Sequence, residues 1–214
     1  MTTVLTVYAG KGGVGKTTTA INLAYQLGKA GHKTLLIDAN AKQPSAQVVY
    51  DTIKGDVPFD LAVEDKPELL AHVRRLTYDY IVIDCPPSPE EAKAALDVAD
   101  LIIVVFVPKF LETRAITDTI RLLANLPFRV LVVGVSYAMR GRVKGARAMM
   151  AGFDQPMFAT SIRAYAVYEN AQALGIPLFV DEAKDQLGAH LEDALADNEA
   201  VYKELMAVLD GTQR

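Results

Sequence analysis

A glycine-rich segment between an apolar stretch and a helix-like stretch constrains this chain more than any other feature. The segment GKGGVGKT begins at Gly10 and fits the pattern G-x-x-x-x-G-K-[ST]. It follows the β-branched stretch TVLTV and precedes a threonine-rich stretch with helical character. Glycines at these positions let successive backbone N–H groups surround phosphate oxygens, and the following helix directs its positive dipole end at the same anion. The pattern predicts a phosphate-binding loop in which Lys16 contacts the β- and γ-phosphates and the Thr17 hydroxyl ligates Mg²⁺.

Apolar runs alternate with helix-like segments along most of the chain. Near-continuous Val- and Ile-rich runs predict strands buried on both faces of a parallel sheet, at residues 3–9, 33–39, 79–85, 100–107 and 128–136. Helices are predicted between them, at residues 16–30, 66–76, 89–98, 113–125 and 142–150. A further strand is expected at 157–162, then a helix at 163–174 and one or two amphipathic helices at 184–209. The alternation predicts an α/β fold of right-handed βαβ units, with helices on both faces of a mostly parallel sheet.

Length and composition favour one folded domain, spanning residues 1–214. The chain is 51% hydrophobic and 22% charged, which argues against disorder, and it lacks an uninterrupted apolar run of membrane-spanning length. Its single cysteine, Cys85, excludes an intramolecular disulfide framework, and the start MTTVLTV lacks the features of a secretory signal. We therefore expect a cytoplasmic protein.

Two lysines, Lys11 and Lys16, share the short glycine-rich loop, where their charges repel unless an anion lies between them. The sequence KGGVGKT resembles the deviant Walker A motif of the ParA/MinD family, the SIMIBI class of P-loop ATPases. The resemblance implies ATP or ADP and Mg²⁺ as ligands, and a homodimer that forms on ATP binding, in which Lys11 reaches the partner's phosphates. A cation supplied in this way links dimerisation to nucleotide state. The alternative is that Lys11 is a solvated loop residue. The residues expected around the phosphates are Gly10, Lys11, Gly12, Gly13, Val14, Gly15, Lys16, Thr17 and Thr18.

Two further segments resemble motifs of the same family. LLIDANAKQPSA occupies the place of switch I, usually D-x-D-P-Q-G-S-A, and YIVIDCPPS resembles the Walker B motif and switch II, usually D-x-P-P. The resemblance implies that Asp84 holds Mg²⁺ or a metal-bound water, and that Asp38 joins the metal shell through water. The alternative for both residues is that a strand-end aspartate caps a turn or a helix. Pro86 and Pro87 are expected to stiffen the switch that senses the γ-phosphate.

The second acid of switch I, which this family uses to position or activate water, falls at Asn40, and the segment is one residue longer than the family pattern. An amide can hold a water molecule but cannot accept its proton as a carboxylate can. Two explanations stay open: a natural variant with weak or relocated hydrolytic machinery, or an Asp-to-Asn substitution that traps the ATP state. Either one predicts slow turnover and a long-lived ATP dimer.

Positive charge gathers in the second half of a chain whose net charge is −4. Between residues 109 and 163, nine basic residues stand against three acidic ones, which gives this segment +6 and the rest of the chain −10. The segment suits phosphate-backbone contact, and the resemblance implies sequence-independent DNA binding by the ATP dimer. The alternatives are a solvated helix face or a loop near the adenine. The candidate DNA contacts are Arg140, Arg142, Lys144, Arg147 and Arg163, while Tyr137 and Arg163 are the adenine candidates by resemblance.

Several specialised roles are disfavoured. The polar face of the last helix is mainly acidic, whereas an interfacial membrane helix needs Lys and Arg there, so no membrane partner is expected. Cys85 stands alone, without the cysteines that ligate an iron–sulfur cluster. The histidines His32, His72 and His190 show no metal-ligand spacing.

The leading hypothesis is a ParA-like ATPase that positions a plasmid, a chromosome or a protein assembly. Mg-ATP drives dimerisation, the dimer binds nonspecific DNA at the nucleoid, and a ParB-like or adaptor protein stimulates hydrolysis. A metabolic enzyme that phosphorylates a carboxylate, resembling dethiobiotin synthetase, is a second hypothesis. A hydrolysis-deficient regulatory module is the third, because of Asn40.

Overall fold

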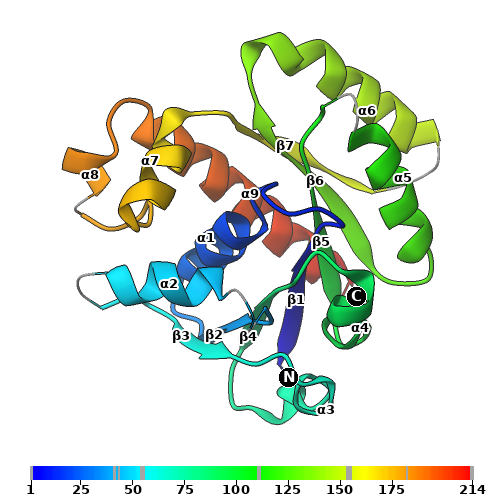
Figure 1. The fold of residues 1–214 in the computed structure, drawn as a ribbon, viewed down its shortest axis with the longest axis vertical. Coiled ribbons are helices and arrows are strands. Elements are labelled where there is room, and N and C mark those ends of the chain that lie inside the picture. The colour runs from blue at the N-terminus through cyan, green and yellow to red at the C-terminus, as the bar shows by residue number, and fades with distance from the viewer. Residues whose placement is uncertain are drawn as a thin grey trace.

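The computed structural model describes residues 2–40, 42, 44–53, 56–109, 112–152, 156–181 and 183–212. Its centre is a seven-stranded sheet in the order β3-β2-β4-β1-β5-β6-β7, in which every neighbouring pair is parallel (Figure 1). The strands are β1 (Thr3–Tyr8), β2 (Thr34–Asp38), β3 (Asp60–Val63), β4 (Tyr80–Asp84), β5 (Leu101–Phe106), β6 (Phe128–Val135) and β7 (Met157–Arg163). The parallel α/β architecture expected from the alternating pattern is confirmed.

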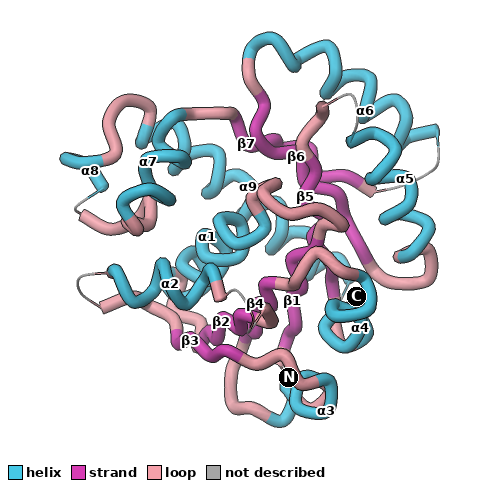
Figure 2. The backbone as a smooth tube through the Cα atoms, in the orientation of Figure 1, coloured by secondary structure: helices cyan, strands magenta, loops and turns pink. Residues whose placement is uncertain are grey.

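Helices cover both faces of the sheet (Figure 2). One face packs against α1 (Lys16–Lys29), α2 (Ser45–Thr52) and α9 (Leu191–Thr212). The other packs against α3 (Pro67–Leu70), α4 (Pro89–Asp97), α5 (Glu112–Leu122) and α6 (Arg140–Gly152). A smaller apolar cluster joins α7 (Ala166–Leu174), α8 (Ala183–Gln186) and the start of α9. Two short 3₁₀ helices, Val73–Arg75 and Tyr137–Met139, precede β4 and α6.

The central strand β1 shows why both faces must be covered. Leu5 points into the cluster beneath α1 and α9, whereas Val4 and Tyr8 point into the cluster beneath α4 and α5, because successive side chains of a strand alternate. Thr6 shares the second face and donates its hydroxyl to the carbonyl of Ala95 in α4 at 2.8 Å. Strand β1 is therefore buried on both sides and holds the loop that follows it in a fixed position.

The sequence reading missed two elements and misplaced others. Strand β3 and helix α2 were not expected; β3 has only four residues at the sheet edge, with its first and last side chains exposed, so it carries no long apolar run. The helix expected at 66–76 is split into α3 and a 3₁₀ turn. The helix expected to begin at Arg163 begins at Ala166, because Arg163 still pairs with Val135 as the last residue of β7. The last segment forms α8 and α9.

Edge strand β7 is held by charged side chains from both flanking helices. Glu204 of α9 accepts the backbone N–H groups of Ala159 and Thr160 at 2.6 and 3.0 Å. Arg147 of α6 donates to the carbonyls of Phe158 and Ala159 at 2.9 and 2.6 Å. These contacts satisfy backbone groups that an exposed edge strand would otherwise offer to another chain.

Gly28 allows α1 to lie against the chain that leads into β3. A Cβ added there would meet the carbonyl oxygen of Pro58 at 1.7 Å, and a backbone atom cannot move aside as a flexible side chain can. The close approach therefore depends on the missing side chain at this position.

We predict that Gly28→Ala lowers the free energy of unfolding by at least about 2 kcal/mol, because overpacking against Pro58 exceeds the helix-propensity gain. Urea unfolding monitored by circular dichroism measures it. Gly145→Ala in α6 is the matched control, since a Cβ there meets nothing within 4 Å. This control should be neutral or stabilising by up to about 1 kcal/mol. Equal effects of the two substitutions would contradict the packing argument.

Candidate nucleotide-binding site

The loop between β1 and α1 has the backbone that its glycines permit. Gly13 and Gly15 adopt φ values of 72° and 97°, which L side chains rarely adopt, and Gly15 is the residue immediately before α1. Lys16 is only 8% exposed, and its Nζ donates to the carbonyl of Lys11 at 3.1 Å. Burial lowers the pKa of Lys16, while the charge of Asp84 opposes that shift. The loop thus curls around its own lysine. Figure 1 shows the loop leading from β1 into α1.

A buried hydroxyl–carboxylate pair lies beside this loop. The Thr17 hydroxyl donates to Oδ2 of Asp84 at 2.6 Å, and Asp84 is 4% exposed at the end of β4. Its other oxygen, Oδ1, is buried and has no hydrogen-bond partner among the described residues. Burial raises the pKa of Asp84 to about 7, against the lowering effect of the Thr17 hydroxyl. A buried carboxylate oxygen without a partner, beside a hydroxyl, is the hard oxygen donor set that Mg²⁺ prefers, so these residues fit the metal.

Asp38 lies next to Asp84, because the two residues are partners in the β2–β4 register. It is fully buried, and its carboxylate accepts backbone N–H groups from Asn40 at 3.1 Å, Ala46 at 2.8 Å and Gln47 at 3.4 Å. Burial raises the pKa of Asp38, and these three bonds oppose the shift. The contacts correspond to the capping alternative, and a water-mediated contact of Asp38 with the metal stays a prediction.

The switch I segment is also tied to the helix after switch II. Lys42 donates to Oε1 of Glu91 in α4 at 2.7 Å, although both side chains are substantially exposed. On the other side of the site, the Tyr8 hydroxyl lies 3.5 Å from the carbonyl of Pro87, which it contacts as a donor. The sequence alone did not indicate Tyr8 and Glu91, because each contacts a residue more than 45 positions away in the chain.

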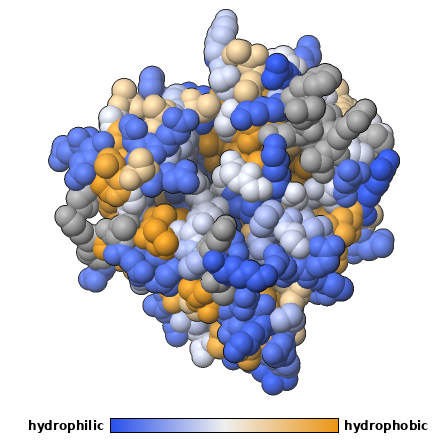
Figure 3. Space-filling view, viewed as in Figure 1, coloured by the Kyte–Doolittle hydropathy of each residue, from blue (hydrophilic) through white to orange (hydrophobic). Residues whose placement is uncertain are grey.

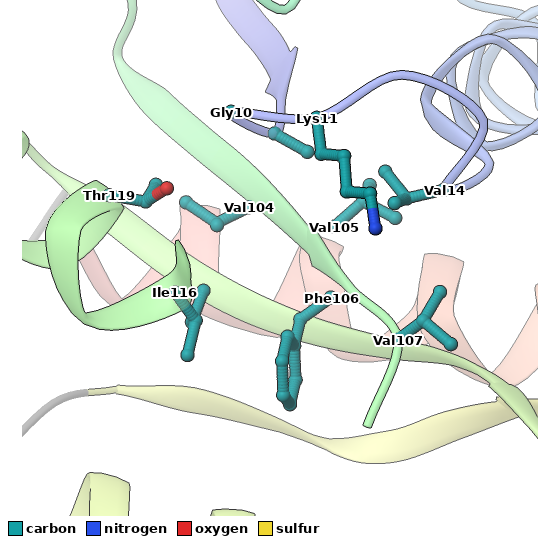
Figure 4. A pocket seen from close by; sticks show the side chains of 10 residues that line it. Gly10, Lys11, Val14, Val104, Val105, Phe106, Val107, Ile116 and Thr119 are labelled. Carbon is teal, nitrogen blue, oxygen red and sulfur yellow. The ribbon is translucent and has the colours of Figure 1, made fainter. Parts of the chain in front are cut away.

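Lys11 lies on the exposed side of the loop. Its side chain lines a pocket formed by the loop, the end of β5 and α5, and in Figure 4 it extends toward Val105 and Val107. Ile116 and Thr119 of α5 line the same pocket. The aliphatic part of the Lys11 side chain therefore lies over apolar side chains, as is common for long cationic side chains.

The five candidate DNA contacts fall into two groups. Arg140, Arg142 and Lys144 are exposed on α6, and the Arg140 guanidinium lies 4.5 Å from the ring centre of Tyr137, which is 81% exposed. Arg147 and Arg163 are instead engaged within the chain. Arg147 holds β7, and Arg163 forms an ion pair with Asp197 at 2.8 Å. Their roles at DNA or adenine stay predictions, but each role competes with these contacts.

Surface chemistry and residue clustering add three findings. The side of the molecule shown in Figure 3 is mostly hydrophilic, with apolar side chains in separate patches. Within the described ranges, no helix is long and apolar enough to cross a membrane. The same residues contain no cluster of three or more His, Cys, Asp or Glu side chains that could hold a metal ion by themselves. A metal at Asp84 therefore needs the Thr17 hydroxyl and oxygen ligands from a bound nucleotide or water.

The fold and the loop define a P-loop nucleotide-binding protein of the α/β class. Residues 5–197 match the family model of the CobQ/CobB/MinD/ParA nucleotide binding domain, and the chain belongs to that family. It is 33% identical over 208 residues to the "Maintenance of carboxysome distribution protein A" of Gloeobacter kilaueensis, covering 94% of this chain and 93% of the relative. It is 26% identical over 234 residues to the "Chromosome partitioning protein ParA" of Caulobacter vibrioides, covering 85% and 88%.

Two solved structures share the fold. A putative plasmid partition protein from Borrelia burgdorferi, bound to AMPPNP, superposes with a TM-score of 0.75 at 20% identity, covering 97% of this chain and 99% of that one. The MinD cell division protein of Aquifex aeolicus gives a TM-score of 0.74 at 22% identity, covering 96% and 97%. The expected resemblance to ParA/MinD ATPases is therefore confirmed, and ATP hydrolysis is the activity of this family.

We predict that, in the metal-free protein, the carboxyl of Asp84 lowers the free energy of unfolding as pH rises. Its folded pKa of about 7 exceeds the ordinary value of 3.8, so the folded state holds a proton that the unfolded state releases. Stability contributed by this group is complete below pH 4 and is lost as pH rises toward and through 7. Asp84→Asn should therefore raise the free energy of unfolding at pH 8 in EDTA by about 1 kcal/mol or more.

Urea titrations of wild type and variant between pH 5 and 8 provide the measurement. The exposed Asp51, replaced by Asn, is the control for the loss of one carboxylate elsewhere in the chain. Parallel profiles for wild type and Asp84→Asn would contradict the assignment.

Proposed function

We propose that this chain is a nucleotide-dependent positioning ATPase. Mg-ATP binds at the loop after β1, two copies close into a sandwich dimer, and the dimer binds DNA until an adaptor or ParB-like partner stimulates hydrolysis and release. The observation that carries the proposal is the loop with two lysines beside a buried Asp84, whose Oδ1 has no partner in the part of the chain that the structure describes. A site that has an anion cradle and an unmatched carboxylate oxygen suits a metal–triphosphate pair.

The residues of the loop have separate roles in this proposal. Backbone N–H groups from Gly12 to Thr17 donate hydrogen bonds to the phosphate oxygens, and the positive charge of Lys16 offsets the negative charge of the β- and γ-phosphates. The Thr17 hydroxyl and the Asp84 carboxylate would hold Mg²⁺, which supplies charge neutralisation at the phosphates when bound. Lys11, at the exposed side of the loop, provides the second cation to the partner's nucleotide.

We also propose that ATP hydrolysis is slow, because Asn40 stands where the family has a second acid. Asn40→Asp should raise the steady-state rate of phosphate release by about tenfold or more, since general-base catalysis contributes roughly 10²–10⁴-fold where it operates fully. Asn40→Ser is the control and should leave the rate at or below the wild-type value. An unchanged rate in Asn40→Asp would instead favour the second candidate, a regulator that binds nucleotide without hydrolysing it.

The proposed DNA surface is the exposed face of α6. Arg140, Arg142 and Lys144 are exposed on one helix, whose described residues include no acid. Such a surface contacts phosphates without selecting a sequence, and dimerisation doubles the number of contacts. The nucleoid would then be the place where the ATP dimer accumulates.

A large protein assembly is the cargo that we favour. The relative from Gloeobacter kilaueensis, similar over 94% of this chain, has a name that refers to carboxysome distribution. The relative from Caulobacter vibrioides is instead named for chromosome partitioning. The higher identity of the first, 33% against 26%, supports a protein assembly over a chromosome.

Lys11→Glu tests the dimer. Light scattering with ATP, with ADP and without nucleotide should give a dimer of the wild-type chain with ATP alone and a monomer of the variant in every condition, because the reversed charge repels the partner's triphosphate. Lys29→Glu makes the same charge change at the far end of α1 and should dimerise normally. A wild-type monomer that acts on a small carboxylate would support the synthetase hypothesis.

The same samples, mixed with nonspecific duplex DNA, test the surface on α6. Arg142→Ala with Lys144→Ala should still dimerise, but the slope of log affinity against log salt should fall by about 3 to 4 for a dimer that loses four contacts. Lys29→Ala with Lys203→Ala is the charge-matched control, on a groove between α1 and α9. Wild-type DNA binding that does not depend on salt or on ATP would overturn the proposal.

A further inference from the structure

One buried carboxylate holds both ends of the switch I segment. Oδ1 of Asp38 accepts the N–H of Asn40 at 3.1 Å, and Oδ2 accepts the N–H groups of Ala46 and Gln47 at 2.8 and 3.4 Å. Asp38 has no exposed surface. A single side chain therefore ties Asn40 to the first turn of α2.

The bonds to Ala46 and Gln47 replace a helix cap that the local sequence lacks. Helix α2 begins at Ser45, and its N-cap residue is Pro44, which makes no side-chain cap hydrogen bond. The first turn of α2 contains no acidic residue. The initial N–H groups of a helix need acceptors from outside the helix, and those of the second and third residues are the usual targets of a cap. Asp38 is therefore a cap supplied from the end of β2.

The bond to Asn40 extends this role toward the chemistry. Asn40 stands where the family has its water-positioning acid, and its backbone is fixed by the same carboxylate that starts α2. The Lys42–Glu91 pair adds a contact between the middle of the segment and α4. Three N–H groups on one carboxylate also occupy most of the lone pairs through which it could bind a metal-bound water.

We propose that Asp38 is a positioning residue, which ties Asn40 to the first turn of α2 and fixes the backbone of Asn40, and that it is not part of the metal shell. The proposal rests on the proposed nucleotide site. The metal-shell role implied by the family resemblance is the competing hypothesis, and the two roles predict different responses to the same substitution.

Asp38→Asn separates the two roles. The isosteric amide retains one oxygen acceptor, but its NH₂ group cannot accept a hydrogen bond. In the nucleotide-free protein, the single amide oxygen can face either Asn40 or the pair Ala46 and Gln47. Hydrogen exchange at the amides on the side that it no longer faces should become about fivefold faster, the fold-change that corresponds to a typical lost N-cap. The Mg²⁺ concentration that supports ADP binding in calorimetry should change less than about twofold. Asp84→Asn is the matched control, with normal exchange at these amides and a lost dependence on Mg²⁺.

A relocated cap provides the rescue. Pro44→Asp places a capping side chain at the N-cap of α2, so in the Asp38→Asn background it should return exchange at Ala46 and Gln47 to within about twofold of wild type. Steady-state phosphate release should show kcat lowered by Asp38→Asn with KM for Mg-ATP unchanged, and kcat partly recovered by the second substitution. A metal ligand cannot be replaced from position 44 in this way.

The proposal is overturned if Asp38→Asn weakens the Mg²⁺ dependence tenfold or more, or if exchange changes at none of the amides of Asn40, Ala46 and Gln47. Failure of Pro44→Asp to restore protection also overturns it. If Asp38→Asn does not fold, the wild-type chain gives the answer. Its amides at 46 and 47 should stay protected when Mg²⁺ and ADP are added, and a more than fivefold loss of protection would count against the cap. Undetectable ATPase activity would contradict the proposed function and leave the exchange and metal measurements decisive for Asp38.

Discussion

The parallel register of β1, β4 and β2 is the constraint on which the site depends. Val7 is paired with Asp84, and Asp84 with Asp38, so these three strands end at the same edge of the sheet. The glycine-rich loop leaves β1 at that edge and places Thr17 within 2.6 Å of Asp84. A shift of one residue in either pairing would turn one aspartate to the opposite face of the sheet.

Burying charged groups at the site costs free energy, which the apolar core must offset. Asp84 and Asp38 are both nearly inaccessible, and the nearby charge of Asp38 adds to the burial that raises the pKa of Asp84. Lys16 is buried beside them and interacts favourably with Asp84. Asp38 accepts three N–H groups, whereas Asp84 accepts one hydroxyl and, among the described residues, its Oδ1 has no partner. The two carboxylates thus differ in kind: the first is satisfied by backbone N–H groups, and the second keeps an oxygen that fits a metal ion.

The sequence could predict the elements whose residue pattern extends over many consecutive positions. The inner strands are continuous apolar runs, and the loop pattern from Gly10 to Thr17 determines both its place and its ligand class. Short elements escaped because they draw their order from tertiary partners: α2 depends on a cap from Asp38, and β3 on pairing with β2. Charge alone was also insufficient, because the partners of Arg147 and Arg163 lie on other elements and cannot be located by composition.

Acidic side chains serve the backbone repeatedly in this fold, and this explains how an acidic chain can present a basic surface. Glu204 holds the edge of β7, Asp197 accepts the N–H and guanidinium of Arg163, and Asp100 accepts the N–H of Val4 at 2.7 Å. Glu204 and Asp197 lie on α9, Asp100 directly precedes β5, and α6 contains no acid. Outside residues 109–163 the chain has a net charge of −10, and some of these acids therefore hold the fold through hydrogen bonds and ion pairs. Positive charge on α6 is left facing solvent at Arg142 and Lys144, where an anionic polymer can reach it.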